Sequence, residues 1–449
     1  MRVQKENQMK VDKTLFSEWI RREIFWGLDF LQGSKVRKHY VDIQNSMENG
    51  MDPEVSKMHE DNLYNILKYA TETVEFYKSF NDFDSIRSFP VINKNIIRNN
   101  YDAFQSPEYP GAAAVNMRTS GSTGAPFVVR HDKNKRDRVY AEMIYIWGKA
   151  GYQIGMKYVF FRISNPFNPL TAWARNVLVF DDRRQDEENF EKFRKKLRSN
   201  HKIRMLLGLP STLEDLGNHF LTCGDTFEKH NINSIICYGE ALSKTVHQKL
   251  KKVFNTNIVS LYSNQENGML AQECIENNEF HVNGASYHVE LLNIDTDDPV
   301  STGEPGRIVV TDLFNHAMPL IRYDTGDIGV SKEEAGCGWS SQVFSSIQGQ
   351  MIDIIFDTKG NKKSPHAISV LMGPFDNLLQ YQFVQEGAKQ YVLKLNGAEE
   401  HYKDAKFVNL FKDFLGQDAG IVIEHVNEIP VLGSGKRKEV VNNYVKGKA

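Results

Sequence analysis

The stretch MRTSGSTGAPF, residues 117–127, gathers small, hydroxylated and flexible residues into one short run. Such a run cannot build a core. Its glycines let backbone N–H groups turn toward one point, and its serine and threonine hydroxyls add further donors. No Gly-Lys-Ser/Thr follows, so the run is not a Walker loop. From its composition alone, a polyphosphate-binding loop and a flexible surface loop both stay open as interpretations.

Short apolar runs on the C-terminal side of this stretch predict β-strands at 157–163, 204–209, 233–239 and 257–263. Charged helical stretches separate several of these runs. This alternation is typical of parallel sheet with crossover helices. The chain therefore indicates an α/β fold.

The pattern of apolar residues and turns changes twice in the second half of the sequence. From about residue 280 to residue 347, apolar runs alternate with Gly/Pro turns, which favours a smaller, more antiparallel, β-rich subdomain. Residues 348–449 have the pattern of a compact α+β unit. We therefore predict a large N-terminal domain of mixed, largely parallel sheets over 1–347, with a helical lead-in over 1–100. A small C-terminal domain follows over 348–449.

Composition excludes several classes of function. The chain has 449 residues, 25% of them charged, and a net charge of −2, so no global field attracts nucleic acid. Its four cysteines are scattered, which favours a reducing, cytoplasmic location over a disulfide framework. No run of 18 apolar residues predicts a membrane span. Residues 15–31 are aromatic and amphipathic, and their mixed charges favour docking on the protein itself over a membrane surface.

Further motifs follow the glycine-rich run in a fixed order. They are YGEALS (238–243), YSNQE (262–266), IRYDTGD (321–327), IQGQMID (347–353) and GSGKRKEVV (433–441). With TSGSTGAP (119–126), they resemble the motifs of the adenylate-forming superfamily of acyl-CoA synthetases, peptide-synthetase adenylation domains and luciferases. The N-terminal region resembles the phenylacetate–CoA ligase branch, and most closely its capsular-polysaccharide-biosynthesis group. The resemblance covers nearly the whole chain.

The resemblance implies a ligase that joins a small carboxylic acid to ATP, forming an acyl-adenylate and pyrophosphate. The acyl group then passes to CoA or to an amine acceptor, the latter fitting a role in capsule biosynthesis. The C-terminal domain is implied to be mobile and to rotate between the two half-reactions. Two alternatives stay open: a nucleotidyl transferase that leaves AMP on its substrate, and a non-catalytic nucleotide-binding relative. Relatives often dimerise, so a homodimer is one of the states open to this chain.

The resemblance also assigns roles to residues. The β- and γ-phosphates fall to Thr119, Ser120, Gly121, Ser122, Thr123 and Gly124. Glu266 is expected to hold Mg²⁺, and Asp327 to accept the ribose hydroxyls. Adenine is expected against the ring of Tyr262 and the backbone of Gly239, Glu240 and Ala241. The implied catalytic residues are Lys436, Glu266 and Thr123.

Several positions depart from the pattern of the family. Gln265 stands where the family has Thr or Ser, and Asp324 stands where it has a second Arg. In the hinge motif, Gln350 replaces the Arg that touches the nucleotide, and Ile352 replaces an Asp. Arg322 is a candidate to offset one lost charge. These changes leave open whether the domain rotates in the usual way.

Three residues are candidate ligands of a zinc ion, namely Cys274, His281 and Cys337. Some phenylacetate–CoA ligase relatives bind a structural zinc ion through Cys, His and a Cys-x-Cys pair, and these three residues match that pattern. The fourth position is Ala335. A structural zinc site takes four ligands, so we expect a vestigial site of buried Cys and His.

Overall fold

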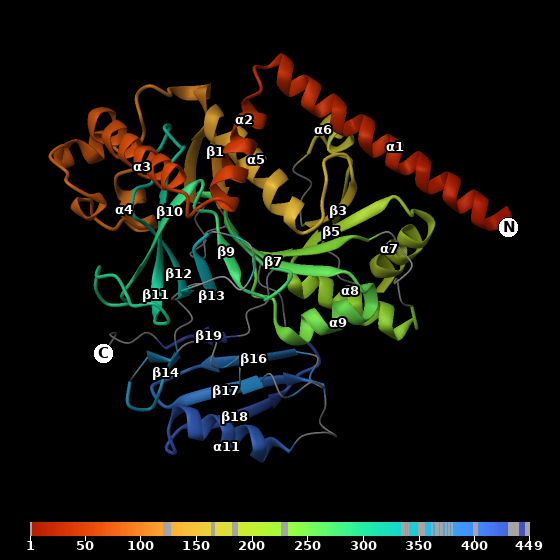
Figure 1. Cartoon of the computed structure of the whole chain (residues 1–449). Helices are drawn as coiled ribbons and strands as arrows, with labels where there is room; N and C mark the ends of the chain where they lie inside the picture. Colours follow the sequence, from red (N-terminus) through yellow and green to blue (C-terminus); the bar gives the residue numbers. More distant parts are fainter. Residues whose placement is uncertain are drawn as a thin grey trace.

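Figure 1 shows the computed structural model of the chain, in which one long sheet and its helices occupy the upper part and a second, smaller sheet lies below. The structure describes residues 2–119, 127–162, 167–181, 187–225, 232–333, 337, 339, 341–348, 355–360, 362–363, 368, 371–372, 375, 378, 380–397, 403–429 and 440–444.

Helices make up most of the first hundred residues. They are α1 (Arg2–Leu31), α2 (Lys35–Glu48), α3 (Pro53–Thr73) and α4 (Lys94–Asn99), with 3₁₀ turns at Glu75–Phe80, Ile86–Ser88 and Gly111–Ala113. Asn93 caps α4, because its side chain accepts hydrogen bonds from the N–H groups of Asn95 and Ile96. This cap fixes Lys94 as the first residue of the helix.

Helix α1 runs along the outside of the molecule (Figure 1). Phe25 and Trp26 pack against the core, whereas Phe16, Ile20 and Ile24 are exposed. The expected docking of this aromatic stretch on the protein itself therefore holds for one face of the helix only. Among the described helices, none has the length and apolar character needed to cross a bilayer.

The long sheet has a parallel half. Its spatial order is β4-β3-β5-β6-β7, and the crossovers between its strands are helical. The strands are β3 (Lys157–Arg162), β4 (Val177–Asp181), β5 (Ile203–Gly208), β6 (Ser234–Tyr238) and β7 (Asn257–Asn264). The helices are α6 (Pro169–Ala174), α7 (Glu187–Ser199), α8 (Pro210–Thr222) and α9 (Lys244–Phe254). Apolar clusters cover both faces, as burial of a parallel sheet requires.

The same sheet continues beyond β7 as an antiparallel half, in the order β8-β9-β13-β12-β11-β10. These strands are β8 (Gly268–Glu273), β9 (Phe280–Val282), β10 (Tyr287–Leu292), β11 (Pro305–Asp312), β12 (Tyr323–Lys332) and β13 (Val343–Gln348). They enclose an apolar cluster that includes Leu270, Val282, Ile308 and Phe344. This half is strongly curled, because β12 and β7 touch although three strands lie between them in the sheet.

A separate hairpin holds the ends of the glycine-rich run. It consists of β1 (Ala114–Thr119) and β2 (Phe127–Asp132), and Thr119 pairs with Phe127 at the end where the connection between the strands begins and ends. Helix α5 (Lys133–Lys149) follows directly, and the Asp132 carboxylate caps it by accepting from the Lys135 N–H at 2.8 Å. Residues 120–126 connect the two strands and lie outside the described residues.

The C-terminal sheet has four described strands in the order β18-β17-β16-β19, with helix α11 packed on it. These elements are β16 (Gln380–Gln385), β17 (Gln390–Asn396), α11 (Asp404–Leu415), β18 (Gly420–His425) and β19 (Val440–Asn442). A two-stranded ribbon, β14 (Ile355–Phe356) with β15 (Lys362–Lys363), precedes it. Phe383, Leu393, Phe407 and Phe411 form the centre of its core.

The predicted α/β fold class is confirmed. The four apolar runs predicted as strands correspond to β3, β5, β6 and β7 within one residue at each end. The β-rich stretch after residue 280 continues the sheet of the parallel half, because β8 pairs with β7 and joins both halves into one sheet of eleven described strands.

Candidate active site

The turn after β6 lies at the carboxyl end of a central parallel strand, where ligands of α/β sheets bind. Gly239 has a φ of 76°, a conformation that glycine adopts without strain. The carboxylate of Glu240 accepts hydrogen bonds from the backbone N–H and the hydroxyl of Ser211, at 3.0 and 3.1 Å. Ser211 belongs to the first turn of α8, whose orphan N–H groups favour a carboxylate. The side chain of Glu240 therefore anchors the turn to α8.

Tyr262 on β7 and Asp327 on β12 meet through a hydrogen bond. The Tyr262 hydroxyl donates to the Asp327 carboxylate at 2.7 Å, and the hydroxyl of Thr325 lies 3.3 Å away. Burial, and next the negative charge of Asp327, raise the pKa of Tyr262 well above its usual range. Tyr262 therefore stays protonated at neutral pH and donates the hydrogen bond. Two residues predicted to hold one nucleoside thus lie together.

Glu266 follows β7 and is almost fully buried, with 3% of its surface exposed. Its carboxylate lies 2.9 Å from the Lys94 ammonium and accepts a hydrogen bond from the Tyr323 hydroxyl at 3.3 Å. Burial, and next the charge of Glu266, raise the pKa of Tyr323 well above its usual range, so this hydroxyl also stays protonated. A buried carboxylate that faces a cation offers an oxygen ligand of the kind that a divalent metal ion takes.

Lys94 connects this carboxylate to the glycine-rich run. Its ammonium lies 5.8 Å from the ring centre of Phe127, the last residue of the run, and the Arg98 guanidinium lies 5.7 Å from the same ring. Since Phe127 pairs with Thr119, both ends of the run lie beside Glu266. The predicted site residues that the structure describes therefore lie in one region of the molecule.

Some predicted site residues lie outside the described part of the chain. These are Ser120, Gly121, Ser122, Thr123, Gly124, Gln350 and Lys436. Of Thr119 only the backbone is described. The structure brings together Tyr262, Asp327 and Glu266, and it gives the positions of Gly239, Glu240 and Ala241.

Sequence reasoning did not include Lys94 or Tyr323 among the site residues. Tyr323 lies inside the quoted IRYDTGD motif, four residues before Asp327. Lys94 has a weaker signal. It begins a helix, and a helix N-terminus disfavours positive charge, so a lysine there calls for an anionic partner.

Arg322, the candidate to offset a lost charge, and Asp324, one of the departures from the family pattern, both have partners within the protein. The Arg322 guanidinium contacts the Glu290 carboxylate through two hydrogen bonds of 3.1 Å and donates to the Phe89 carbonyl at 3.0 Å. Asp324 forms an ion pair of 2.6 Å with Arg307. Arg322 is therefore committed to packing β10 against the N-terminal region, and the idea that it replaces a lost charge at the nucleotide is wrong.

Aromatic side chains gather at the carboxyl ends of β3 and β6. The ring centre of Phe160 lies 5.8 Å from that of Tyr238 and 6.4 Å from that of Phe167. The Tyr238 hydroxyl donates to the Phe161 carbonyl at 3.2 Å. The described ends of β3 and β6 and Phe167 are therefore neighbours.

The three candidate zinc ligands also converge. The ligand atoms of Cys274, His281 and Cys337 lie within 4.8 Å of one another, and Cys337 Sγ is 3.0 Å from His281 Nε2. The other ring nitrogen of His281 contacts the Ser341 hydroxyl at 3.1 Å. Burial lowers the pKa of His281 to about 4, so the ring is neutral, as a metal ligand must be. The described residues supply three of the four ligands that a structural zinc ion takes.

The fold and these contacts point to one class of protein. A doubly covered parallel sheet that ends in a glycine turn, a tyrosine–aspartate pair and a buried glutamate beside a glycine-rich connection is the arrangement of an AMP-forming ligase. The chain belongs to the AMP-binding enzyme family, whose model matches residues 53–314. The model of the CapK C-terminal domain matches residues 355–443.

Individual relatives agree with this assignment. The chain is 22% identical to Protein CapK of Staphylococcus aureus, over 93% of this chain and 95% of that protein. It is also 22% identical to a phenylacetate-coenzyme A ligase of Thermus thermophilus, over 77% of this chain and 82% of that enzyme. A solved 2-hydroxyisobutyryl-CoA ligase shares the fold with a TM-score of 0.71 at 15% identity, covering 89% of this chain and 92% of that one. The resemblance to a CapK-related, phenylacetate–CoA-ligase-like branch is confirmed.

Proposed function

We propose that the chain activates a small carboxylic acid with Mg²⁺·ATP and then transfers the acyl group to CoA or to an amine acceptor. One observation carries the proposal. The buried carboxylate of Glu266 lies against Lys94 and Tyr323, next to both ends of the glycine-rich run. An acid, a mobile cation and a loop rich in N–H and hydroxyl donors together suit a polyphosphate with its metal.

The nucleoside binds across β7 and β12 in this proposal. The ring of Tyr262 and the backbone of Gly239, Glu240 and Ala241 face adenine, and Asp327 accepts both ribose hydroxyls. The hydrogen bond from Tyr262 to Asp327 supports this assignment, because it holds one carboxylate oxygen in a fixed position. A preformed acceptor reduces the entropy cost of binding the sugar.

The phosphates bind between the glycine-rich run and Lys94. Thr119, Ser120, Gly121, Ser122, Thr123 and Gly124 supply donors, and the Lys94 ammonium moves from Glu266 onto a phosphate oxygen. Lys94 can move because a third of its side chain is exposed, whereas Glu266 is buried. The attack of one anion on another then proceeds under fixed positive charge, which stabilises the transition state.

Glu266 suits Mg²⁺ by the kind of donor that it offers. Mg²⁺ takes one or two carboxylates together with substrate phosphates, and Glu266 is a buried carboxylate that already faces a cation. When bound, the ion neutralises phosphate charge and orients the α-phosphate. The departure of Lys94 from Glu266 leaves a carboxylate oxygen free for it.

The C-terminal residues 348–449 are proposed as a mobile domain that brings Lys436 to the reacting oxygens. The chain leaves β18 at one edge of the C-terminal sheet and returns as β19 at the opposite edge, and Lys436 lies in this connection. A connection of that length on a separate sheet suits a lysine that enters the site only in one domain orientation.

The relatives support two candidate acceptors. The phenylacetate-coenzyme A ligase named above uses CoA, as its name states, whereas the match to Protein CapK spans nearly the whole of both chains. The match along the full length favours a role in capsule or other surface polysaccharide synthesis, where an amine on a sugar is the natural acceptor.

The test is ATP–pyrophosphate exchange with a panel of small carboxylic acids. Exchange with at least one acid supports the proposal, and AMP release on addition of CoA or an amino sugar then identifies the acceptor. A stable adenylylated product without AMP release would make the protein a nucleotidyl transferase. ATP binding without exchange for any acid would make it a non-catalytic relative.

A further inference from the structure

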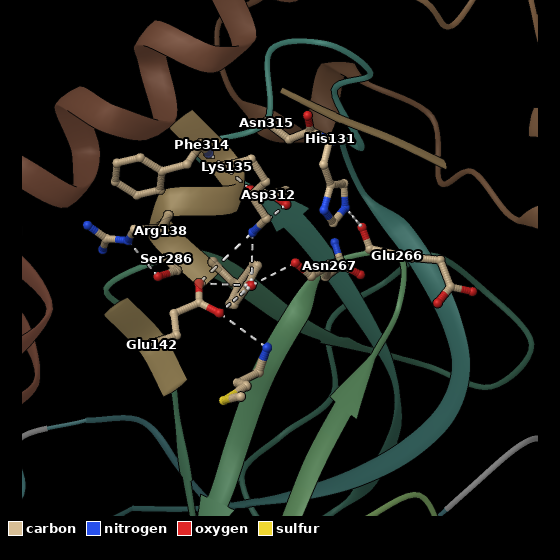
Figure 2. Close-up of polar contacts among 12 residues, drawn as sticks. His131, Lys135, Arg138, Glu142, Glu266, Asn267, Ser286, Asp312, Phe314 and Asn315 are labelled. Carbon is tan, nitrogen blue, oxygen red and sulfur yellow. Dashed lines mark hydrogen bonds and ion pairs between the residues drawn. The ribbon is translucent and has the colours of Figure 1, made fainter. Parts of the chain in front are cut away.

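A group of fully buried charged and polar side chains lies behind the Glu266 turn (Figure 2). The Lys135 ammonium of α5 lies 2.8 Å from the Asp312 carboxylate, donates to the Tyr287 hydroxyl at 2.9 Å and lies 4.0 Å from the Glu142 carboxylate. We call these four residues the Lys135 network. Burying these charges costs desolvation free energy that apolar packing would avoid. The Lys135 network therefore needs a role other than stabilising the fold.

The Lys135 network and His131 hold the backbone of residues 266–269. His131 Nε2 donates to the Glu266 carbonyl at 2.8 Å, and the Met269 N–H donates to the Glu142 carboxylate at 3.2 Å. The Tyr287 hydroxyl lies 3.0 Å from both the Asn267 carbonyl and Glu142. The Tyr287 hydroxyl accepts a hydrogen bond from Lys135. Its single proton therefore points toward the Asn267 carbonyl and the Glu142 carboxylate. Three successive contacts thus fix the segment that carries Glu266.

Two features indicate that the backbone contacts are what positions this turn. The side-chain amide of Asn267 is fully buried yet has no hydrogen-bond partner among the described residues, so it does not anchor the turn. Gly268 has a φ of 137°, and a Cβ there would lie 2.6 Å from the Tyr287 hydroxyl and 2.9 Å from Glu142. Only glycine lets the backbone approach the network so closely.

We propose that the Lys135 network is a positioning device for the Glu266 carboxylate, which holds the turn from behind so that the carboxylate meets the metal–polyphosphate at a fixed place. Its members are positioning residues, because they contact the backbone of the turn and not the substrate. The inference rests on the proposed function, since it assigns the metal to Glu266. Groups behind metal ligands generally tune affinity in this way, and their loss costs about 10- to 100-fold.

The decisive variant is Tyr287→Phe, which keeps the ring and removes the hydroxyl. Calorimetry measures the affinity for the ATP analogue AMP-PNP with and without Mg²⁺, and the affinity for AMP. We expect the Mg²⁺-dependent gain in AMP-PNP affinity to fall about ten-fold, with AMP binding unchanged, because AMP does not reach the metal. The matched control is Tyr391→Phe, which removes a buried hydroxyl that donates to the Phe356 carbonyl at 2.7 Å in the C-terminal sheet.

A second variant protects the test against misfolding. Glu142→Gln keeps an oxygen acceptor for the Met269 N–H but removes the charge, and we expect a loss in the same direction. The proposal is overturned if both variants keep the wild-type Mg²⁺ effect, or if AMP binding falls in parallel with AMP-PNP binding. If the wild-type protein shows no Mg²⁺-dependent nucleotide binding, the proposed function itself fails, and this result is distinct from a failure of the network.

Discussion

The ammonium of Lys94 occupies a position that local electrostatics disfavours, at the first residue of α4. The negative charge of Glu266 offsets this cost in the structure, and a bound phosphate would do so during the reaction. We therefore expect Lys94→Met to lower kcat/KM for ATP about 100-fold in pyrophosphate exchange, since one preorganised charge on the phosphates is lost.

The control for Lys94→Met is Lys68→Met, which removes an exposed lysine whose partner is Glu72 on the same helix. This variant should keep wild-type kinetics, because exposed pairs of this kind contribute little. Wild-type kcat/KM in the Lys94 variant would remove Lys94 from the site.

A second prediction concerns Asp327 and distinguishes an effect on ATP binding from an effect on the chemical step. Replacement by Asn keeps the size of the side chain but removes the charge that would strengthen the proposed hydrogen bonds to both ribose hydroxyls. We expect KM for ATP to rise about ten-fold with kcat nearly unchanged. The preference of the wild-type protein for ATP over 2′-deoxy-ATP should also shrink in Asp327→Asn. An unchanged preference would contradict ribose binding by this carboxylate.

The sequence predicted some residues of the candidate site and missed others. Tyr262, Glu266 and Asp327 were predicted from motif order, and the structure brings them together. Lys94 was not, because its contact with Glu266 joins segments 172 residues apart and no periodic pattern reports such a contact. The buried pairing of Arg322 with Glu290 was missed for the same reason.

At the scale of elements, strands β7 and β8 form the joint between the parallel and antiparallel halves of the sheet. Glu273 on β8 lies in this joint, and its carboxylate accepts from the Ser260 N–H on β7 at 2.8 Å. Burial raises the pKa of Glu273 to about 7, although the hydrogen bond opposes the shift. A group with a raised carboxyl pKa keeps its proton in the folded state when the unfolded state has already lost it.

The consequence for stability has a definite sign. Below pH 4.5 both states are protonated and Glu273 has no effect. As the pH rises from 4.5 to 7, the folded state binds more protons than the unfolded state, so the free energy of unfolding decreases. We expect Glu273→Gln to remove this decrease, so that the variant gains about 2–3 kcal/mol relative to wild type between pH 5 and pH 8.

Urea unfolding followed by tryptophan fluorescence measures this effect. All five tryptophans precede residue 348, so the signal reports the part of the chain that contains β7 and β8. Glu72→Gln, at an exposed position on α3, should show no such pH dependence relative to wild type. An equal difference from wild type at pH 5 and pH 8 for Glu273→Gln would contradict the predicted shift.

Sequence patterns predicted elements better than their arrangement. The apolar runs of β3, β5, β6 and β7 were recognisable because strands buried on both faces are continuously apolar. The curl of the antiparallel half was not, although it brings Tyr262 on β7 to Asp327 on β12. Alternating patterns report which face of a strand is buried, whereas curl depends on register and on bulges such as those in β11–β12 and β12–β13.

At the scale of the whole molecule, the described parts form two bodies of secondary structure with separate cores. The described residues that are proposed to bind the nucleotide all belong to the larger body. Lys436 lies outside the described residues, and its place in the sequence is between β18 and β19, which are strands of the smaller body. A half-reaction that uses Lys436 as well as the nucleotide site of the larger body must bring the two together. A half-reaction that uses only the larger body must not depend on Lys436.

This division leads to a prediction about the two half-reactions. Lys436→Ala should lower pyrophosphate exchange about 100-fold or more, because a charge on the transferring oxygens is lost. The same variant should consume a chemically prepared acyl-adenylate at the wild-type rate once the acceptor is present, since under the proposed domain rotation Lys436 leaves the site before that step. The neighbouring Lys438→Ala serves as the matched control and should preserve both rates. Equal losses in both half-reactions would contradict the alternation, because they would mean that Lys436 supports the fold or both steps in one domain orientation.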